Sequence, residues 1–305
     1  MEDKKVIIVT GANSGIGFEA AKGLCQLGHD VVISVRDDAK GETTVSAIKA
    51  EVPEAQLMYI TMEMSDPQSI RDFVEKFLAT GKPLHVLINN AGLSKGFRSA
   101  ERFTARDDAL LEITMIVNCM GPFLLTHLLL EKLKESGTES SPARIVNVSS
   151  SLTLRKAPPP NGLTLANLML EGDAYKSGYQ AYRNSKLALN LWSNLLAAKL
   201  EGSSVILNTV CPGFIPGTGL ARDSLTSHAS AFAFGLLDSF VGRLFVNTKP
   251  VSEGQKRLIK MALDKETQTN GVFYYDDKPG SEAPEVLDQD NIDKIWDLCV
   301  KYSAL

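Results

Sequence analysis

A glycine-rich junction between a short apolar run and a helix-like stretch constrains this chain most. Residues 4–10 (KKVIIVT) are β-branched and almost wholly apolar, as in a parallel strand covered by helices on both faces. Gly11, Gly15 and Gly17 follow directly, before the helical pattern of residues 18–27. Small residues there let the chain turn sharply and let a pyrophosphate approach the helix N-terminus. The G-x-x-x-G-x-G spacing in this context predicts a dinucleotide-binding βαβ unit.

The alternation of strand and helix continues along the chain. Further strands are expected at residues 30–35, 56–63, 83–89, 143–149, 204–211 and 271–275, and further helices at 40–52, from Pro67, at 106–134, 178–200, 251–263 and 291–302. Parallel strands joined by helices form an open sheet wound in both directions. We therefore expect an α/β fold with a doubly wound, Rossmann-like parallel sheet and helices on both faces. It forms a single NAD(P)-binding domain over residues 1–305, and the segment around 214–250 acts as a substrate lid.

The tip of the second expected strand bears on the choice of cofactor. A carboxylate at that position would bind a free ribose 2′-hydroxyl and select NAD. The chain instead has Arg36, whose guanidinium is placed to pair with a 2′-phosphate. The alternative is that Arg36 pairs with Asp37 or Asp38 in the same loop. We favour the phosphate, and therefore NADP(H) as the cofactor.

Tyr182 and Lys186 lie four residues apart in the helix-like stretch 178–200. On a helix these positions share one face, so the ammonium lies beside the phenol. A nearby positive charge favours the phenolate, so we expect the pKa of Tyr182 to fall from about 10 toward the working range of a general acid or base. Such pairs also arise by chance on surfaces. The catalytic interpretation therefore depends on a hydride donor and an oxygen-binding partner elsewhere in the chain.

Polar and small residues follow three of the other expected strands. These are residues 89–92 (NNAG), the serines 149–151, and the turn 212–213 (PG). The carboxyl ends of parallel strands meet at one edge of the sheet, where open α/β sheets bind ligands. Ordinary turns and loop hydrogen bonds are the alternatives for each motif.

Together these motifs resemble the short-chain dehydrogenase/reductase family. Residues 10–17, 89–92, Asn118, the serine after residues 144–148, Tyr182-x-x-x-Lys186 and residues 212–213 occur in the family's order. The resemblance spans roughly residues 4–275. Residues 121–126, the long gap between Ser150 and Tyr182, and residues 212–220 are most similar to the branch of retinol dehydrogenases and protochlorophyllide reductases.

The resemblance implies a role for each matching position. Tyr182 would donate the proton, while Lys186 would lower its pKa and hold the nicotinamide ribose. Ser150 would hydrogen-bond the substrate oxygen, and Asn118 would keep a water in the proton relay. The resemblance also implies residues that hold the cofactor. At the phosphates these are Gly11, Ser14, Ile16 and Gly17, with Arg36 at the 2′-phosphate and Glu63 beside the adenine. Near the ribose and nicotinamide they are Asn89, Gly92, Tyr182 and Lys186, and after the last long strand they are Pro212, Gly213 and Thr218.

Three features of the sequence complicate this transfer of roles. Ser149 and Ser151 compete with Ser150, although the register of the preceding strand favours Ser150. Glu63 stands where the family usually has Asp, and its longer side chain weakens the adenine contact. The family's usual Asp-Gly pair before the Asn118 helix is replaced by residues 106–109 (RDDA).

Composition and charge narrow the partners. A net charge of −4 and a pI near 5.7 give no basic footprint for nucleic acid. The four cysteines and four histidines have no metal-ligand spacing, so we expect reduced thiols and no metal. The first residues run into a strand without a signal-type segment, and we expect no apolar run to reach membrane-spanning length. We therefore expect a cytoplasmic protein unless a transit peptide was removed.

The expected function is reduction of a small apolar aldehyde or ketone by NADPH, or the reverse oxidation of an alcohol. The apolar run 229–245 packs in the core or forms a patch at a substrate entrance or membrane surface, which allows peripheral membrane contact. The resemblance implies a homodimer through the two long helices, although packing on the sheet explains their apolar stripes equally well. The alternative function is a cofactor-binding regulator or scaffold with little catalysis.

Overall fold

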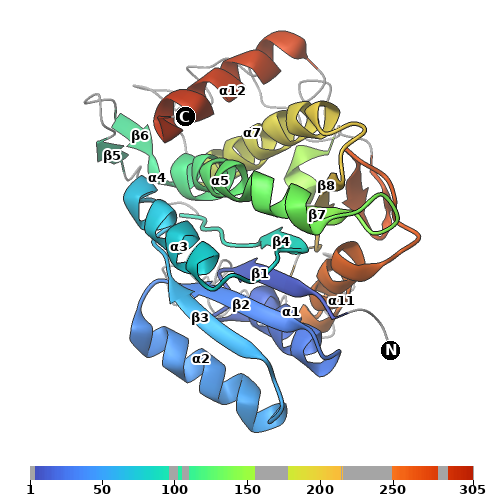
Figure 1. The fold of residues 1–305 in the computed structure, drawn as a ribbon. Coiled ribbons are helices and arrows are strands. Elements are labelled where there is room, and N and C mark those ends of the chain that lie inside the picture. The colour runs from blue at the N-terminus through green and yellow to red at the C-terminus, as the bar shows by residue number, and fades with distance from the viewer. Residues whose placement is uncertain are drawn as a thin grey trace.

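The computed structural model describes residues 4–95, 102–104, 110–154, 178–213, 215, 249–280 and 288–304. At its centre is an eight-stranded sheet with the order β10-β9-β8-β7-β4-β1-β2-β3 (Figure 1). The strands are β1 (Val6–Thr10), β2 (Asp30–Val35), β3 (Leu57–Thr61), β4 (Val86–Asn89), β7 (Ala143–Val148), β8 (Val205–Cys211), β9 (Phe273–Tyr275) and β10 (Lys278–Pro279). Every pairing in this sheet is parallel except that of β9 with β10.

Helices cover both faces of the sheet, which confirms the doubly wound α/β fold (Figure 1). One face carries α1 (Gly15–Gln26), α2 (Asp38–Glu51) and α11 (Val251–Leu263); the other carries α3 (Pro67–Ala79), α5 (Gly121–Ser136), α7 (Gly178–Lys199) and α12 (Gln289–Ser303). Alternate residues of each strand serve the two cores: Ile8 and Leu87 pack in one, Ile7 and Ile88 in the other. Strands buried on both faces need such continuous apolar runs.

Local capping explains where several helices begin. Asp66 accepts a hydrogen bond from the backbone of Gln68, and Pro67 occupies the first turn of α3. Asp37 caps α2 in the same way through the amide of Lys40. These caps lie within a few residues of the starts expected from the sequence.

The expected helix over residues 106–134 was wrong in its first part. Residues Leu110–Glu112 form strand β6, which pairs antiparallel with β5 (Arg102–Thr104). The helical path begins only at α4 (Ile113–Met115), where the buried carboxylate of Glu112 accepts from the amide of Met115 at 3.0 Å. Antiparallel pairing with the preceding strand has here overridden the local helical pattern.

The expectation that no apolar run reaches membrane-spanning length was also wrong. Within the described part of the chain, one helical run, Ile113–Ser136, is long and apolar enough by length and composition, with a mean hydropathy of 1.7. In this fold 83% of its most apolar window is buried. A helix that is apolar on all sides is expected wherever sheet and neighbouring helices surround it.

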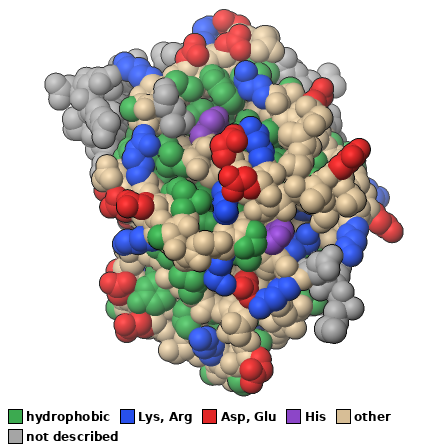
Figure 2. All heavy atoms as spheres, in the orientation of Figure 1, with side chains coloured by type: hydrophobic (Ala, Val, Ile, Leu, Met, Phe, Trp, Pro, Cys, Tyr) green, Lys and Arg blue, Asp and Glu red, His purple; other side chains and the backbone are tan. Residues whose placement is uncertain are grey.

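The surface drawn in Figure 2 mixes acidic and basic side chains over the same elements rather than gathering one sign into a patch.

Candidate active site

The glycine turn after β1 is packed too closely for side chains. Gly11 has a φ of +65°, and a Cβ there would lie 2.8 Å from the Cα of Ala91. A Cβ at Gly17 would lie 2.4 Å from the side-chain nitrogen of Asn90. The open side of the turn faces the start of α1, where Ser14 is the N-cap but its hydroxyl makes no capping bond. The first turn of α1 holds no acidic side chain, so these residues fit a phosphate group.

Asn90 and Thr10 hold the glycine turn in place. The Asn90 amide donates to the main-chain oxygens of Thr10 at 2.8 Å and Gly11 at 3.2 Å. The Thr10 hydroxyl accepts from the backbone amides of Asn90 and Ala91, at 3.0 and 2.9 Å. The sequence reasoning gave Asn90 no role of its own, and its only signal was its place in the NNAG motif.

Asn89 was expected near the ribose and nicotinamide, but its side chain is directed into the protein interior. It is 2% exposed, and its amide donates to Asn147 at 2.8 Å and Thr126 at 3.0 Å. Alternation along β4 explains this orientation, because successive side chains point to opposite faces. Asn89 therefore ties β4 to β7 and α5 instead of presenting its side chain at the edge.

Arg36 and Glu63, which are both expected near the adenosine of the cofactor, differ in their contacts. Arg36 is exposed and makes no ion pair within the described residues, while Lys40 takes the carboxylate of Asp37 that was the alternative partner. Its guanidinium can therefore meet a phosphate. Glu63 is half-buried, and one of its carboxylate oxygens accepts from the amide and hydroxyl of Ser65, at 3.1 and 2.9 Å. That engagement further weakens an adenine contact by Glu63.

Among the three serines after β7, only Ser150 is placed beside the tyrosine. Its hydroxyl lies close enough to the Tyr182 phenol to favour the phenolate. Ser149 is buried and donates to Asn190 at 2.7 Å, and Ser151 hydrogen-bonds the thiol of Cys211. The three serines thus lie beside three different partners.

Lys186 lies one helical turn after Tyr182 on α7 and is 3% exposed. Its ammonium donates to the carbonyl of Val148 at 2.7 Å and lies 5.9 Å from the ring centroid of Tyr182. A Cβ at Gly92 would lie 3.6 Å from that ammonium and 3.2 Å from Oδ1 of Asn118. The absent side chain at Gly92 therefore leaves space between the two polar groups.

The pKa of Tyr182 shifts in the direction opposite to the one expected. Burial raises the pKa of the phenol, and the neighbouring Ser150 hydroxyl offsets this rise only in part. Burial also lowers the pKa of Lys186 to about 8. The prediction failed because it counted the neighbouring charge and left out desolvation, which depends on the surrounding fold. In this state the phenol is protonated at neutral pH.

Asn118 lies in η1 (Ile116–Met120), a π-helical turn between α4 and α5. The backbone amide of Gly121 donates to the carbonyl of Ile116, five residues back. Single π turns occur often at functional sites, and nothing in the sequence signals this one. The Asn118 amide bonds both main-chain polar groups of Leu93, at 2.8 and 2.9 Å, and donates to Ser185 at 3.0 Å. Its side chain therefore ties the loop after β4 to α7, and the relay water stays a prediction.

The turn after β8 lies next to these residues. Gly213 follows Cys211 and Pro212 and has a φ of +93°, which favours glycine. Its amide donates to the sulfur of Cys211 at 3.4 Å. Thr218 and almost all of the expected lid, residues 214 and 216–248, lie outside the described residues.

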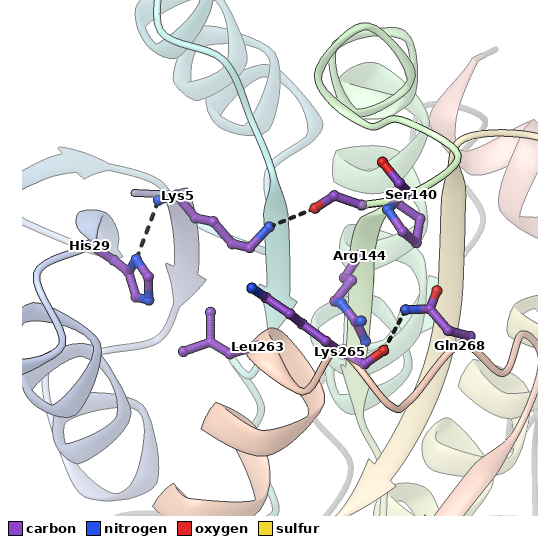
Figure 3. A pocket seen from close by; sticks show the side chains of 9 residues that line it. Lys5, His29, Ser140, Arg144, Leu263, Lys265 and Gln268 are labelled. Atoms are coloured by element: carbon purple, nitrogen blue, oxygen red, sulfur yellow. Dashed lines mark hydrogen bonds between the residues drawn. The ribbon is translucent and has the colours of Figure 1, made fainter. Parts of the chain in front are cut away.

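A cavity of about 190 Å³ lies at the opposite, amino edge of the sheet (Figure 3). It is lined in part by Lys5, Ser141 and Arg144, and the Lys5 ammonium donates to Ser141 at 3.2 Å. The Arg144 guanidinium is engaged by the carbonyls of Thr267 and Asp264, at 2.9 and 2.7 Å. This cavity shares no residue with the predicted site. Among the described residues, no group of His, Cys, Asp and Glu comes together that could hold a metal.

Comparisons with known proteins agree with this arrangement. The family profile described as short chain dehydrogenase matches residues 5–160. Retinol dehydrogenase 12 of Bos taurus is 36% identical over 299 residues, which covers 96% of this chain and 84% of that protein. Polyprenol dehydrogenase of Homo sapiens is 35% identical over 298 residues, covering 96% and 83%.

Solved structures share the fold at lower identity. The RhlG/NADP active-site complex of Pseudomonas aeruginosa has a TM-score of 0.65 and 24% identity, covering 88% of this chain and 93% of that one. The chain belongs to the short-chain dehydrogenase/reductase family of oxidoreductases, in the branch of the retinol dehydrogenases.

Proposed function

We propose that this protein transfers a hydride between NADP(H) and a small apolar carbonyl or alcohol, with Tyr182 as the general acid and base. The observation that carries the proposal is the placement of the Ser150 hydroxyl beside Tyr182, one helical turn from the buried Lys186, in a member of an oxidoreductase family. The names of two relatives support the apolar substrate, because one is a retinol dehydrogenase and the other a polyprenol dehydrogenase.

The residues of this chain would hold the cofactor along the carboxyl edge of the sheet. The glycine turn and the start of α1 would take the phosphates, and the exposed Arg36 would take the 2′-phosphate. The ribose and nicotinamide would lie between Gly92, Lys186 and the turn after β8. A bound dihydronicotinamide would supply the hydride.

Tyr182 and the side chains around it would transfer the proton to the substrate oxygen. When hydride reaches the carbonyl carbon, negative charge develops on the oxygen, and the hydroxyls of Ser150 and Tyr182 donate hydrogen bonds to it. Tyr182 then gives its proton to that oxygen. The raised pKa of Tyr182 keeps the phenol protonated at neutral pH, which suits the reducing direction. We assign the return of the proton to Lys186, whose pKa of about 8 lies near neutrality.

The test combines a fluorescence titration with NADPH and an assay of NADPH oxidation against retinoid, steroid, quinone and short aliphatic carbonyls. We expect Tyr182→Phe to bind NADPH normally and to lose on the order of 10²- to 10⁴-fold in turnover. Tyr179→Phe is the control, because its exposed hydroxyl lies one turn earlier on α7. Unchanged turnover in Tyr182→Phe would overturn the mechanism. NADPH binding by the wild type without turnover of any carbonyl would favour the regulator or scaffold instead.

The substrate lid, the homodimer, the peripheral membrane contact and the cytoplasmic location stay predictions.

A further inference from the structure

We propose that Arg257 is a positioning residue, which fixes the loop after β8 in the shape that the nicotinamide end of the cofactor requires. The inference rests on the proposed function, because that function assigns Pro212 and Gly213 of this loop to the cofactor. Arg257 lies on α11, far from the glycine turn and from the Tyr182 motif in sequence.

The guanidinium of Arg257 joins three separate segments. Arg257 is 5% exposed, and its Nη1 donates to the carbonyl of Pro212 at 3.0 Å. Its Nη2 donates to a carboxylate oxygen of Asp276 at 2.5 Å, and Nε lies 3.7 Å from the carboxylate of Asp277. A planar fork of donors can hold several acceptors in fixed directions, which a lysine cannot do.

The carboxylates belong to a rigid turn. Asp276 and Asp277, between β9 and β10, have φ values of 48° and 61°. Two successive residues in the left-handed region form the tight hairpin turn that matches the twist of paired strands. Since β9 also pairs with β8 through Tyr275 and Cys211, this turn is anchored beside the end of β8. The turn therefore gives Arg257 a fixed support.

The loop after β8 rests directly on the guanidinium. A Cβ built on Gly213 would lie 3.2 Å from Nη1 of Arg257 and 3.1 Å from a side-chain carbon of Lys249. Gly213 also has a φ of +93°. Gly213 therefore combines a left-handed backbone with a close contact to the guanidinium. The conformation of the loop after β8 thus depends on Arg257.

The same face of α11 also contacts the phosphate end of the site. Gly254 lies three residues before Arg257, so the two positions are neighbours on the helix surface. A Cβ at Gly254 would lie 2.6 Å from Ile215 and 3.2 Å from Ile16. Ile16 belongs to the glycine turn, and Ile215 to the loop after β8. α11 thus fixes the distance between the two ends of the cofactor site.

A change in this loop reaches the catalytic residues through Cys211. Its thiol precedes Pro212 and hydrogen-bonds Ser151, the neighbour of Ser150. The Pro212 carbonyl held by Arg257 is therefore one residue from a group that contacts the serine loop.

The test uses Arg257→Met in the full chain and measures three quantities: the Kd for NADPH by fluorescence, kcat in the NADPH oxidation assay, and the exchange rate of the Gly213 amide hydrogen without cofactor. We expect the Kd to rise about tenfold, kcat to fall on the order of 100-fold, and the Gly213 amide to exchange faster. Asp276→Asn should show the same changes at about threefold, because Asn tolerates the left-handed backbone while the charge is lost.

Arg144→Met is the matched control, because Arg144 is also 5% exposed and binds carbonyls near the other end of α11. It should lower thermal stability and leave both the Kd and the Gly213 exchange unchanged. Equal effects in both variants, or wild-type values in Arg257→Met, would reduce Arg257 to a purely structural residue. If Arg257→Met does not fold, Arg257→Lys and Asp276→Asn decide the same question. Failure of the wild type to bind NADPH would overturn the proposed function itself.

Discussion

The two edges of the sheet each hold a buried arginine. Comparing them distinguishes an arginine that supports the fold from one that supports the proposed cofactor site. Arg144 at the amino edge and Arg257 at the carboxyl edge are both 5% exposed. Arg144 donates to main-chain carbonyls at the end of α11, and burial lowers its pKa. Arg257 instead bridges two carboxylates and the loop after β8.

The comparison teaches that burial and residue type do not identify a site residue by themselves. What decides is the segment that the buried charge holds. Arg144 holds a helix end beside the cavity of Figure 3, which lies away from the predicted chemistry. Arg257 holds a loop that the proposed function assigns to the cofactor. Changes at the carboxyl edge should therefore alter turnover, and changes at the amino edge should alter stability alone.

Replacing Lys186 should give the largest effect on turnover, and it should change turnover and stability in opposite directions. Lys186→Met should reduce turnover on the order of 10²- to 10⁴-fold, because the proton path to Tyr182 loses its cation. The same variant should raise the free energy of unfolding at pH 7 by about 1 to 3 kcal/mol, since a buried ammonium with a pKa lowered to about 8 opposes folding. Steady-state assays and urea unfolding measure the two effects.

The pH dependence of this gain follows from the sign of the shift. The unfolded chain binds the Lys186 proton more tightly than the folded protein, so the penalty is present below pH 8 and disappears as the pH rises toward about 10.5. The stability difference between variant and wild type should shrink over that range. Lys199→Met, on the exposed last turn of α7, is the control and should show no such trend.

Arg144→Met tests the other edge. Loss of its hydrogen bonds to Thr267 and Asp264 should lower the free energy of unfolding by about 2 to 3 kcal/mol, because those carbonyls lose a charged donor. Turnover should stay at the wild-type value once the protein is folded. A fall in kcat matching that of a carboxyl-edge variant would break the comparison.

Arg36→Ala should change the choice of cofactor by a smaller amount. We expect the preference for NADPH over NADH to fall about tenfold, since an exposed guanidinium gives a charge-assisted hydrogen bond of modest strength. The ratio of kcat/KM for the two cofactors measures it. Lys40→Ala is the control, because Lys40 pairs with Asp37. An unchanged ratio in Arg36→Ala would contradict the assignment of NADP(H).

Asp30→Asn should give the smallest effect, again at the amino edge. Burial raises the pKa of Asp30, but hydrogen bonds from Lys4 and Lys82 outweigh it and lower the pKa overall. The paired carboxylate therefore stabilises the fold above about pH 4, and this contribution disappears as the pH falls through the folded pKa. The variant should lose about 1 kcal/mol at pH 7 and match the wild type in acid, as followed by thermal unfolding.

Much of the fold and the central residues of the site could be predicted because their signals are local. The glycine turn follows an apolar strand directly, and the four-residue spacing of Tyr182 and Lys186 fixes their shared helix face. Strand alternation was enough to favour Ser150 over its neighbours. The helix expected at 251–263 matches the bounds of α11, which its apolar periodicity predicts.

Other features depend on contacts that a local pattern does not contain. The pairing of β5 with β6 changed residues 110–112 from helix to strand. The pKa of Tyr182 depends on burial by distant segments. Arg257 donates to the carbonyl of Pro212, which lies 45 residues away in the sequence, so no local sequence pattern predicts this hydrogen bond. The interior position of Asn89 also required the completed sheet.

The π turn at η1 has a consequence for protein engineering. Each residue of an α-helix turns the chain by about 100° around the helix axis. One extra residue in a turn therefore rotates the helix segment before that turn relative to the segment after it. Deleting one residue between Ile116 and Gly121 would let the turn relax to ordinary helical spacing and would swing Asn118, the partner of the Leu93 loop, away from α7. Homologues or designs that shorten this helix by one position should therefore lose the anchor of that loop while keeping the helix itself.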